Sequence, residues 1–195
     1  EQQMGQDYGH LNEWNKKKVD KTHGLPVAWQ QEQRRKREAA NWQAKEYLVQ
    51  LGEDENPGKE QALHILRLWG FSKNFDRSNV RPKGSRWVLS DTLGLMPWQG
   101  APEWTEASIG SESVFQLLSR WVQVDLGAEA GMPFTTMTLN AGYAAKRHRD
   151  GMNEGPTAIA ALGQHQGGAL RVWRKDNREE RPDALSEEGS EIIDV

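Results

Sequence analysis

The stretch Thr136-Met-Thr-Leu-Asn-Ala141 decides the fold of this chain. Apolar and polar residues alternate along it, which is the pattern of a half-buried β-strand. Apolar runs at 157–162 and 169–173, with a glycine-rich turn at 163–168 between them, predict further strands. Upstream of residue 133 the apolar spacing is mainly helical. We therefore expect an α+β chain in which helices precede a sheet that curls into a barrel or sandwich.

Three upstream segments carry the helical pattern. They are Pro26 to Leu51, Glu60 to Trp69, and Ser111 to Leu126, the last with Ser111 or Ser113 as its expected N-cap. A strand is expected from Trp87 to Leu95, followed by a break in the chain between Pro97 and Pro102. The predicted organisation is a loose polar tail (1–24), a helical N-terminal extension (25–86) and a β domain (87–195) whose end, 174–195, is a solvated connection.

The residues that most clearly suggest a chemical function are His148-Arg149-Asp150. In an extended segment His148 and Asp150 project to one face and Arg149 to the other. One imidazole and one carboxylate are two of the three ligands in the facial triad that holds non-haem Fe(II). The same letters begin a protein-kinase catalytic loop, but that loop needs asparagine where this chain has Gly155. Arg149 is expected to be structural.

The surrounding order resembles a known enzyme family. Thr138-Leu-Asn140-Ala-Gly-Tyr143 leads to His148-Arg-Asp150, and then to Asn153-Glu-Gly-Pro156, Ala158-Ile-Ala160 and Gly167-Gly168-Ala-Leu170. This resembles the TET/JBP-like branch, found in algae and other protists, of the Fe(II)/2-oxoglutarate dioxygenases. The resemblance is firm over residues 134–173.

The resemblance implies a double-stranded β-helix (jelly-roll) oxygenase core and the cofactors Fe(II) and 2-oxoglutarate. It makes His148 and Asp150 the iron ligands, Asn140 and Tyr143 residues of the co-substrate pocket, and Asn153 a residue at the mouth of the site. The reaction would be hydroxylation of a C–H bond, with 5-methylcytosine or another modified base as the candidate substrate.

The third iron ligand and the basic residue that holds 2-oxoglutarate are expected beyond Val195, because in this family they lie on later strands. We interpret both ends of the sequence as cut, and expect the fragment alone neither to hold iron tightly nor to turn over. His165, in the turn 163–168, is not expected to replace that ligand. The earlier histidines, His10, His23 and His64, are not expected to bind metal.

Composition limits the remaining classes. The chain has 195 residues, no cysteine and a net charge of -3, so thiolate sites are excluded and nucleic-acid binding would need a local basic patch. Arg34 to Arg37 and Lys146-Arg147 are the candidates for contacts with DNA or RNA phosphates, although a solvated helix face also explains the first run. No apolar stretch is long enough to cross a membrane. We expect an intracellular protein, with the nucleus as a candidate location.

Two alternatives stay open. The same fold would suit a dioxygenase that hydroxylates a protein side chain or a small molecule. A non-catalytic β-barrel interaction module would leave His148 and Asp150 incidental.

Overall fold

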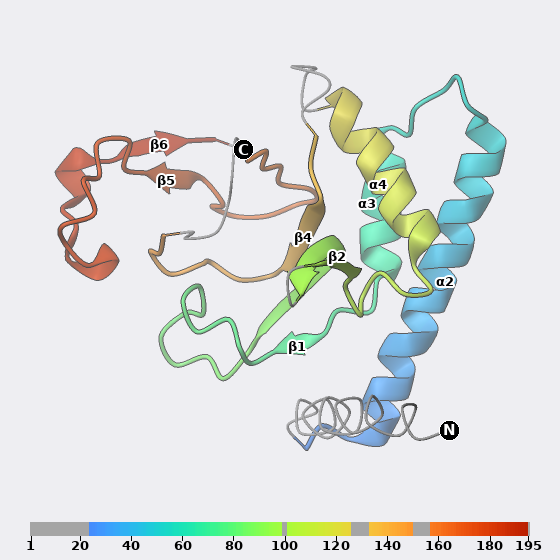
Figure 1. Ribbon diagram of the computed structural model, residues 1–195, viewed down its shortest axis with the longest axis horizontal. Helices are drawn as coiled ribbons and strands as arrows, with labels where there is room; N and C mark the ends of the chain where they lie inside the picture. Colours follow the sequence, from blue (N-terminus) through green and yellow to red (C-terminus); the bar gives the residue numbers. More distant parts are fainter. Residues whose placement is uncertain (1–23, 99–100, 126–132, 150–156, 195) are drawn as a thin grey trace, which may run out of the picture.

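The computed structural model describes residues 24–98, 101–125, 133–149 and 157–194. It is a mixed α+β structure in which helices lie to one side of antiparallel strands and a small C-terminal hairpin lies to the other (Figure 1). The helices are α2 (Val27–Leu51), α3 (Lys59–Leu68) and α4 (Glu112–Asp125). The strands are β1 (Lys73–Asn74), β2 (Val88–Trp98), β3 (Ala101–Trp104), β4 (Thr136–Ala141), β5 (Leu170–Val172) and β6 (Glu191–Ile193), with 3-10 turns η1 (Pro182–Ala184) and η2 (Glu187–Gly189).

The helical predictions are confirmed, and Ser111, one of the two expected N-caps, directly precedes α4, where its carbonyl oxygen accepts from the N–H of Phe115 at 3.1 Å. A side chain of α2 adds a second cap. The first-turn N–H groups of Ser113 and Val114 donate to Oδ1 of Asn41 at 2.9 and 3.3 Å. Asn41 belongs to α2, so a side chain 72 residues away satisfies donors that every helix N-terminus leaves unpaired. This cap fixes the N-terminus of α4 against the middle of α2.

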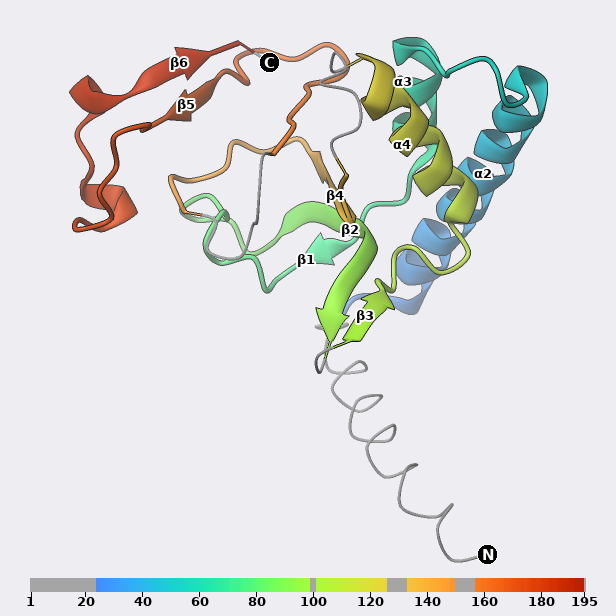
Figure 2. The same ribbon diagram turned by 45° about the horizontal axis from the view of Figure 1, so that its top comes forward.

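Strand β2 organises the main sheet (Figure 2). It pairs antiparallel with β4 from Leu89↔Ala141 to Gly94↔Thr136, and with β1 through Leu89↔Lys73. Beyond this region it pairs with β3, where Pro97 faces Pro102. Both prolines, which were expected in a break of the chain, thus lie in paired strands, and that part of the expectation is wrong.

Helices and sheet share one hydrophobic core. Ile65, Leu93, Leu117 and Val114 are fully buried in it, and Leu139 of β4 is 7% exposed. The alternation predicted for β4 is confirmed, since Leu139 points into this core while Asn140 is exposed. Because α2 and α3 pack in the same core as β2 and β4, residues 25–86 and the residues that follow share one hydrophobic core.

One C-terminal expectation is wrong and another is incomplete. Residues 157–162 form no strand, although Leu162 packs against the core. Residues 174–194 are solvated, as expected, since none of them is buried, but they are more than a connection, because β6 pairs with β5 through Leu170↔Ile193 and Val172↔Glu191. The described residues form two sheets, one of four strands (β1 to β4) and one of two strands (β5 and β6). Neither sheet closes into a barrel. Among the described residues, no helix has the length and apolar character needed to cross a membrane.

A buried ion pair joins α2 to β2. Nη2 of Arg37 donates to Oδ1 of Asp91 at 2.8 Å, and the two side chains are 20% and 5% exposed. Oδ2 of the same carboxylate accepts from Nε1 of Trp69 and from the main-chain N–H of Ser72, both at 3.0 Å. Nε of Arg37 donates to the Gly70 carbonyl oxygen at 2.7 Å. The pair thus connects α2, the end of α3 and the central strand.

Gly94 is a position where only glycine fits. Its φ is +104°, and a Cβ atom there would lie 2.1 Å from the Thr135 carbonyl oxygen. We expect Gly94→Ala to lower the free energy of unfolding by roughly 3 kcal/mol, because strained backbone and a steric clash add together. Urea denaturation measures this change. Gly84→Ala is the matched control, since Gly84 has a φ of +85° but nothing within 4 Å of its Cβ position. It should cost only about 1 kcal/mol, and equal losses in the two variants would contradict the packing argument.

Candidate functional site

The loop after β4 holds His148 through main-chain contacts. The N–H of Lys146 donates to the Val80 carbonyl oxygen at 2.9 Å, which ties the loop to the segment between β1 and β2. Nδ1 of His148 lies 2.8 Å from the Lys146 carbonyl oxygen. Because a carbonyl oxygen can only accept, Nδ1 carries the proton and Nε2 of the neutral ring carries the lone pair.

This arrangement fits a metal ligand. Histidines that bind metals commonly donate their other ring N–H to a main-chain carbonyl or a carboxylate, which fixes the tautomer and the ring orientation. Asp150 and Asn153 lie outside the described residues, so the expected juxtaposition of His148 with Asp150 stays a prediction. Within the described ranges, no three metal-binding side chains of histidine, aspartate or glutamate come together.

His165 and His64 have local partners. Nδ1 of His165 lies 2.7 Å from the Gly167 carbonyl oxygen, within the predicted turn. Nδ1 of His64 lies 2.7 Å from the hydroxyl of Tyr47, so this histidine joins α3 to α2. The contact of His64 is that of a packing residue, as its position before the β domain suggested.

Asn140 and Tyr143 come together at the end of β4. Oδ1 of Asn140 accepts from the Tyr143 hydroxyl and from the Ser90 hydroxyl, both at 2.8 Å. Nη1 of Arg77 lies 3.4 Å from the same oxygen and 2.9 Å from Oγ of Ser90. Ser90 is 1% exposed, whereas Asn140 is exposed. These four residues, Arg77, Ser90, Asn140 and Tyr143, form what we call the Asn140 cluster.

Sequence reasoning missed Arg77 and Ser90. Arg77 lies in a loop rich in serine, asparagine and basic residues, where no periodic pattern distinguishes one arginine from another. Ser90 faces Asn140 directly across the β2–β4 ladder, so its role depends on the register of the two strands. The only signal in the sequence for this contact was that both segments, β2 and β4, are expected to be strands. The two hydroxyl groups donate to the Asn140 amide oxygen, so the Arg77 guanidinium, with its five N–H donors, is the group of the cluster that suits recognition of a carboxylate.

Arg149 has a structural partner, as its predicted direction away from Asp150 suggested. Its Nε and Nη2 donate to the two carboxylate oxygens of Asp176 at 2.5 and 2.6 Å. The Arg149 guanidinium, with a further hydrogen bond from the main-chain N–H of Arg178, lowers the pKa of Asp176 to about 2. A two-point contact of this kind fixes orientation as well as charge.

The pH dependence of this contact follows from the lowered pKa. A carboxyl group with a depressed folded-state pKa stabilises the fold above its ordinary value of 3.8, and that contribution is lost as the pH falls toward about 2. We therefore expect the Arg149–Asp176 contact to persist at pH 5 and to weaken between about pH 4 and pH 2. A carboxyl carbon NMR titration of Asp176 measures this, and a midpoint near the ordinary value would contradict the contact.

The basic residues suggested as phosphate contacts differ in their surroundings. Arg37 is engaged with Asp91, and Arg147 with the C-terminal segment, where it forms an ion pair with Glu187 at 3.7 Å. Arg34 and Arg35 are largely exposed and have only long contacts, at 3.5 and 3.9 Å, with glutamates on their own helix. The run Arg34 to Arg37 is thus a solvated helix face with one buried exception.

Comparisons with protein families, with curated proteins and with solved structures find no match for this chain. The case for a function therefore rests on the residues themselves.

Proposed function

We propose that this chain carries part of an Fe(II)/2-oxoglutarate-dependent dioxygenase, with His148 and Asp150 as two of its iron ligands. In this proposal β2 and β4 belong to a double-stranded β-helix of the TET/JBP-like type. The observation that carries it is the contact between Nδ1 of His148 and the Lys146 carbonyl oxygen, which leaves the lone pair of the neutral ring on Nε2. His165 makes the same kind of contact, but only His148 lies in the motif with Asp150, in the loop that follows the half-buried strand β4.

The Asn140 cluster supports the co-substrate part of the proposal. 2-Oxoglutarate carries two carboxylates, and Arg77 adds a guanidinium beside the hydroxyl groups of Ser90 and Tyr143. Charge-assisted hydrogen bonds from such groups are about twice as strong as neutral ones. In the proposal Asn140 and Tyr143 orient the co-substrate, and Arg77 contributes the positive charge.

Iron with 2-oxoglutarate supplies, when bound, the oxidising chemistry that hydroxylates a C–H bond. The contribution of this chain is to hold the imidazole of His148 in one tautomer and to supply the Asp150 carboxylate. Asn153 lies at the mouth of the site in this proposal. The proposal assigns no residue of 1–195 to the third iron ligand or to the anchor for the second carboxylate.

For the substrate we propose a modified base such as 5-methylcytosine in DNA or RNA. A base in a duplex must leave the stack to reach the iron. Lys146, exposed and two residues before His148, offers a contact for phosphate. A nucleic-acid substrate is also the reason to consider a nuclear location.

The test is Fe(II)-dependent formation of succinate from 2-oxoglutarate by the protein that carries this chain. We expect succinate release to rise with an oligonucleotide containing 5-methylcytosine, and not with the unmethylated oligonucleotide. A rise only with peptides or small molecules would favour the same chemistry on another substrate. No iron-dependent succinate under any condition would contradict the proposal and favour a non-catalytic interaction module.

A further inference from the structure

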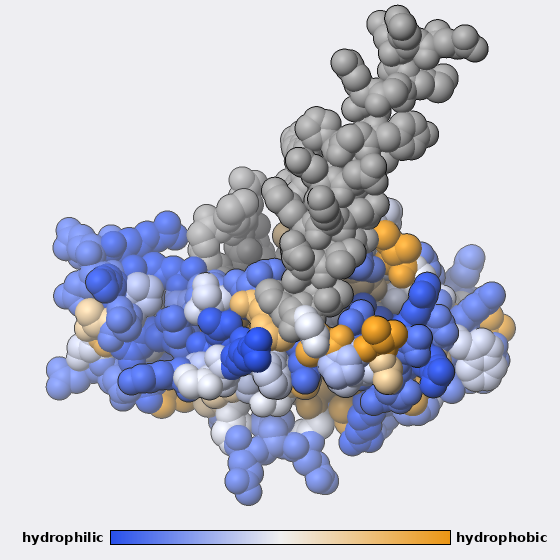
Figure 3. Space-filling view, turned by 90° about the horizontal axis from the view of Figure 1, so that it is seen from below, coloured by the Kyte–Doolittle hydropathy of each residue, from blue (hydrophilic) through white to orange (hydrophobic). Residues whose placement is uncertain are grey.

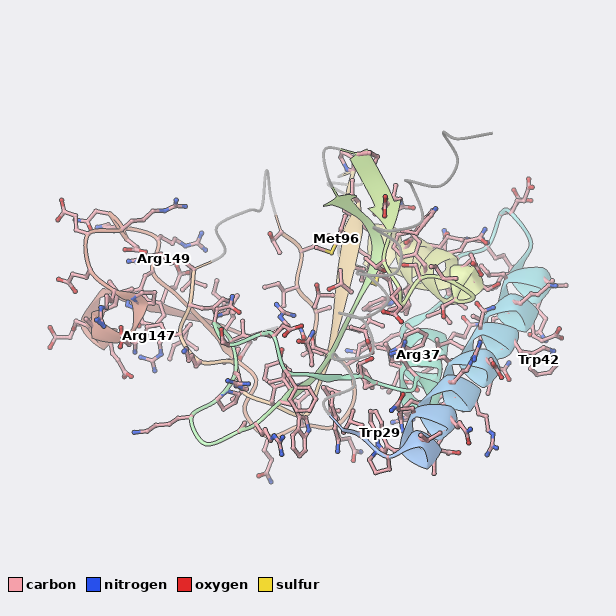
Figure 4. The ribbon with its side chains drawn as sticks, turned by 60° about the horizontal axis from the view of Figure 1, so that its bottom comes forward. Trp29, Arg37, Trp42, Met96, Arg147 and Arg149 are labelled. Carbon is pink, nitrogen blue, oxygen red and sulfur yellow. The ribbon has the colours of Figure 1, made fainter. Side chains whose placement is uncertain are left out.

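We propose that residues 170–193, the C-terminal segment, act as a clamp that positions His148 through its two neighbours, Arg147 and Arg149. Both arginines reach this segment, and Figure 4 shows them beside it. Arg147 and Arg149 are thus positioning residues. The catalytic meaning of the clamp rests on the proposed function, whereas the clamp itself is a statement about the loop that holds His148.

Arg147 is held by three kinds of contact. Its guanidinium lies 4.4 Å from the ring centroid of Trp173, which is a cation–π distance. Nη1 donates to the carbonyl oxygen of Leu185, and Nη2 lies 3.7 Å from a carboxylate oxygen of Glu187. Trp173 is itself fixed, because its Nε1 donates to the Ser186 carbonyl oxygen at 2.8 Å. The side chain of Arg147 is 23% exposed, so this contact is partly shielded from water.

Arg149 makes the second anchor. Its two-point contact with Asp176 joins side chains that are 24% and 14% exposed. Asp176 is held by hydrogen bonds within its own turn. Its main-chain N–H donates to the Trp173 carbonyl oxygen at 3.2 Å, and its Oδ1 accepts from the N–H of Arg178 at 3.0 Å. Both anchors therefore involve the turn that follows β5, through Trp173 and Asp176, and Arg147 in addition reaches Leu185 and Glu187 farther along the segment.

The C-terminal segment is attached to the rest of the chain through polar contacts. None of residues 170–194 is buried, and none belongs to the hydrophobic core. In Figure 3 this segment, at the left, is largely hydrophilic on the face shown. Arg147 and Arg149 contribute side-chain hydrogen bonds and ion pairs between it and residues 24–149.

His148 lies between the two anchored arginines in the sequence. Side chains at 147 and 149 that are fixed to one segment leave the backbone of residue 148 little freedom to rotate. The hydrogen bond from Nδ1 to the Lys146 carbonyl oxygen then fixes the ring on that backbone. The clamp would in this way hold Nε2 in one direction before any metal arrives, which is the preorganisation that binding sites need.

The test is charge reversal in the 195-residue chain. Asp176→Arg and Arg149→Asp each place like charges together, and the double variant restores an opposite pair. The readouts are the tautomer of His148, by imidazole nitrogen NMR, and hydrogen exchange of the amides in 144–149. We expect each single variant to give mixed tautomers and about tenfold faster exchange, and the double variant to recover. Where reversal unfolds the chain, Arg149→Lys keeps the charge without the two-point contact and should give the smaller change of the same kind.

The control is Arg174→Asp, which reverses a charge within the C-terminal segment. Arg174 pairs with Glu191 at 2.5 Å, and these side chains are 65% and 53% exposed. This variant should leave the tautomer and the exchange of 144–149 unchanged. An unchanged His148 in both single variants, or equal effects from the control, would overturn the clamp. Mn²⁺ titration of the protein that carries this chain, with the same variants, separates the two proposals: a released His148 with unaltered Mn²⁺ affinity leaves the clamp standing and counts against the metal role of His148.

Discussion

Replacing Arg37 with methionine is expected to lower the free energy of unfolding by about 3 to 5 kcal/mol. Methionine replaces the unbranched apolar stem of the arginine side chain but removes the charged partner of the Asp91 carboxylate, which is 5% exposed. That carboxylate would keep its hydrogen bonds from Trp69 and Ser72 but lose its counter-charge. An uncompensated buried charge costs more than the ion pair contributes, because water cannot reach it. Native proteins have free energies of unfolding of roughly 5 to 15 kcal/mol, so such a loss would remove a large part of the stability of this chain.

Urea denaturation measures this prediction, and Arg34→Met is its control. Arg34 lies three residues earlier on the same helix, with a side chain that is 83% exposed and a 3.5 Å contact with Glu38. An exposed pair of this kind contributes at most about 1 kcal/mol. Similar losses in the two variants would mean that helix propensity, and not the contact with Asp91, explains the change.

Replacing His148 with alanine is expected to weaken Fe(II) binding and iron-dependent turnover by more than about 100-fold in the protein that carries this chain. Even residues that only support a ligand change metal affinity by 10- to 100-fold, so removal of a ligand should exceed that range. Asp150→Ala should behave in the same way. The thermal midpoint should change little, because His148 is only partly buried and its Nδ1 contacts a main-chain oxygen of its own loop.

His165→Ala is the matched control for this prediction. Nδ1 of His165 contacts a main-chain carbonyl oxygen two residues away at 2.7 Å, as Nδ1 of His148 does at 2.8 Å. The two substitutions therefore remove the same kind of local hydrogen bond. Retained turnover in His148→Ala, or an equal loss in His165→Ala, would remove the basis for assigning iron to this motif.

The elements that sequence patterns predicted well are those whose stability is encoded locally. The stripe of apolar residues in α4 and the alternation in β4 identify a buried face without knowledge of what covers it. The prediction of a strand at 157–162 was wrong because a short apolar run specifies burial but not strand pairing. Leu162 packs against the core without joining a sheet. The β2–β3 hairpin was missed because proline lacks an N–H yet is tolerated where that donor is not required by the ladder.

In the candidate site, too, some features are encoded locally and others depend on contacts between distant residues. The sequence alone determined the helices, the strand β4 and the position of the His148 motif in the segment after it, because periodicity and motif order are properties of neighbouring residues. Only the tertiary structure decided that Arg37 pairs with Asp91, that Asn41 caps α4, that Arg77 and Ser90 join Asn140, and that Arg147 and Arg149 reach the C-terminal segment. Each of these contacts joins residues from 13 to 73 positions apart. At such separations the partner of a polar side chain is chosen by the register and packing of whole elements, which no local pattern records.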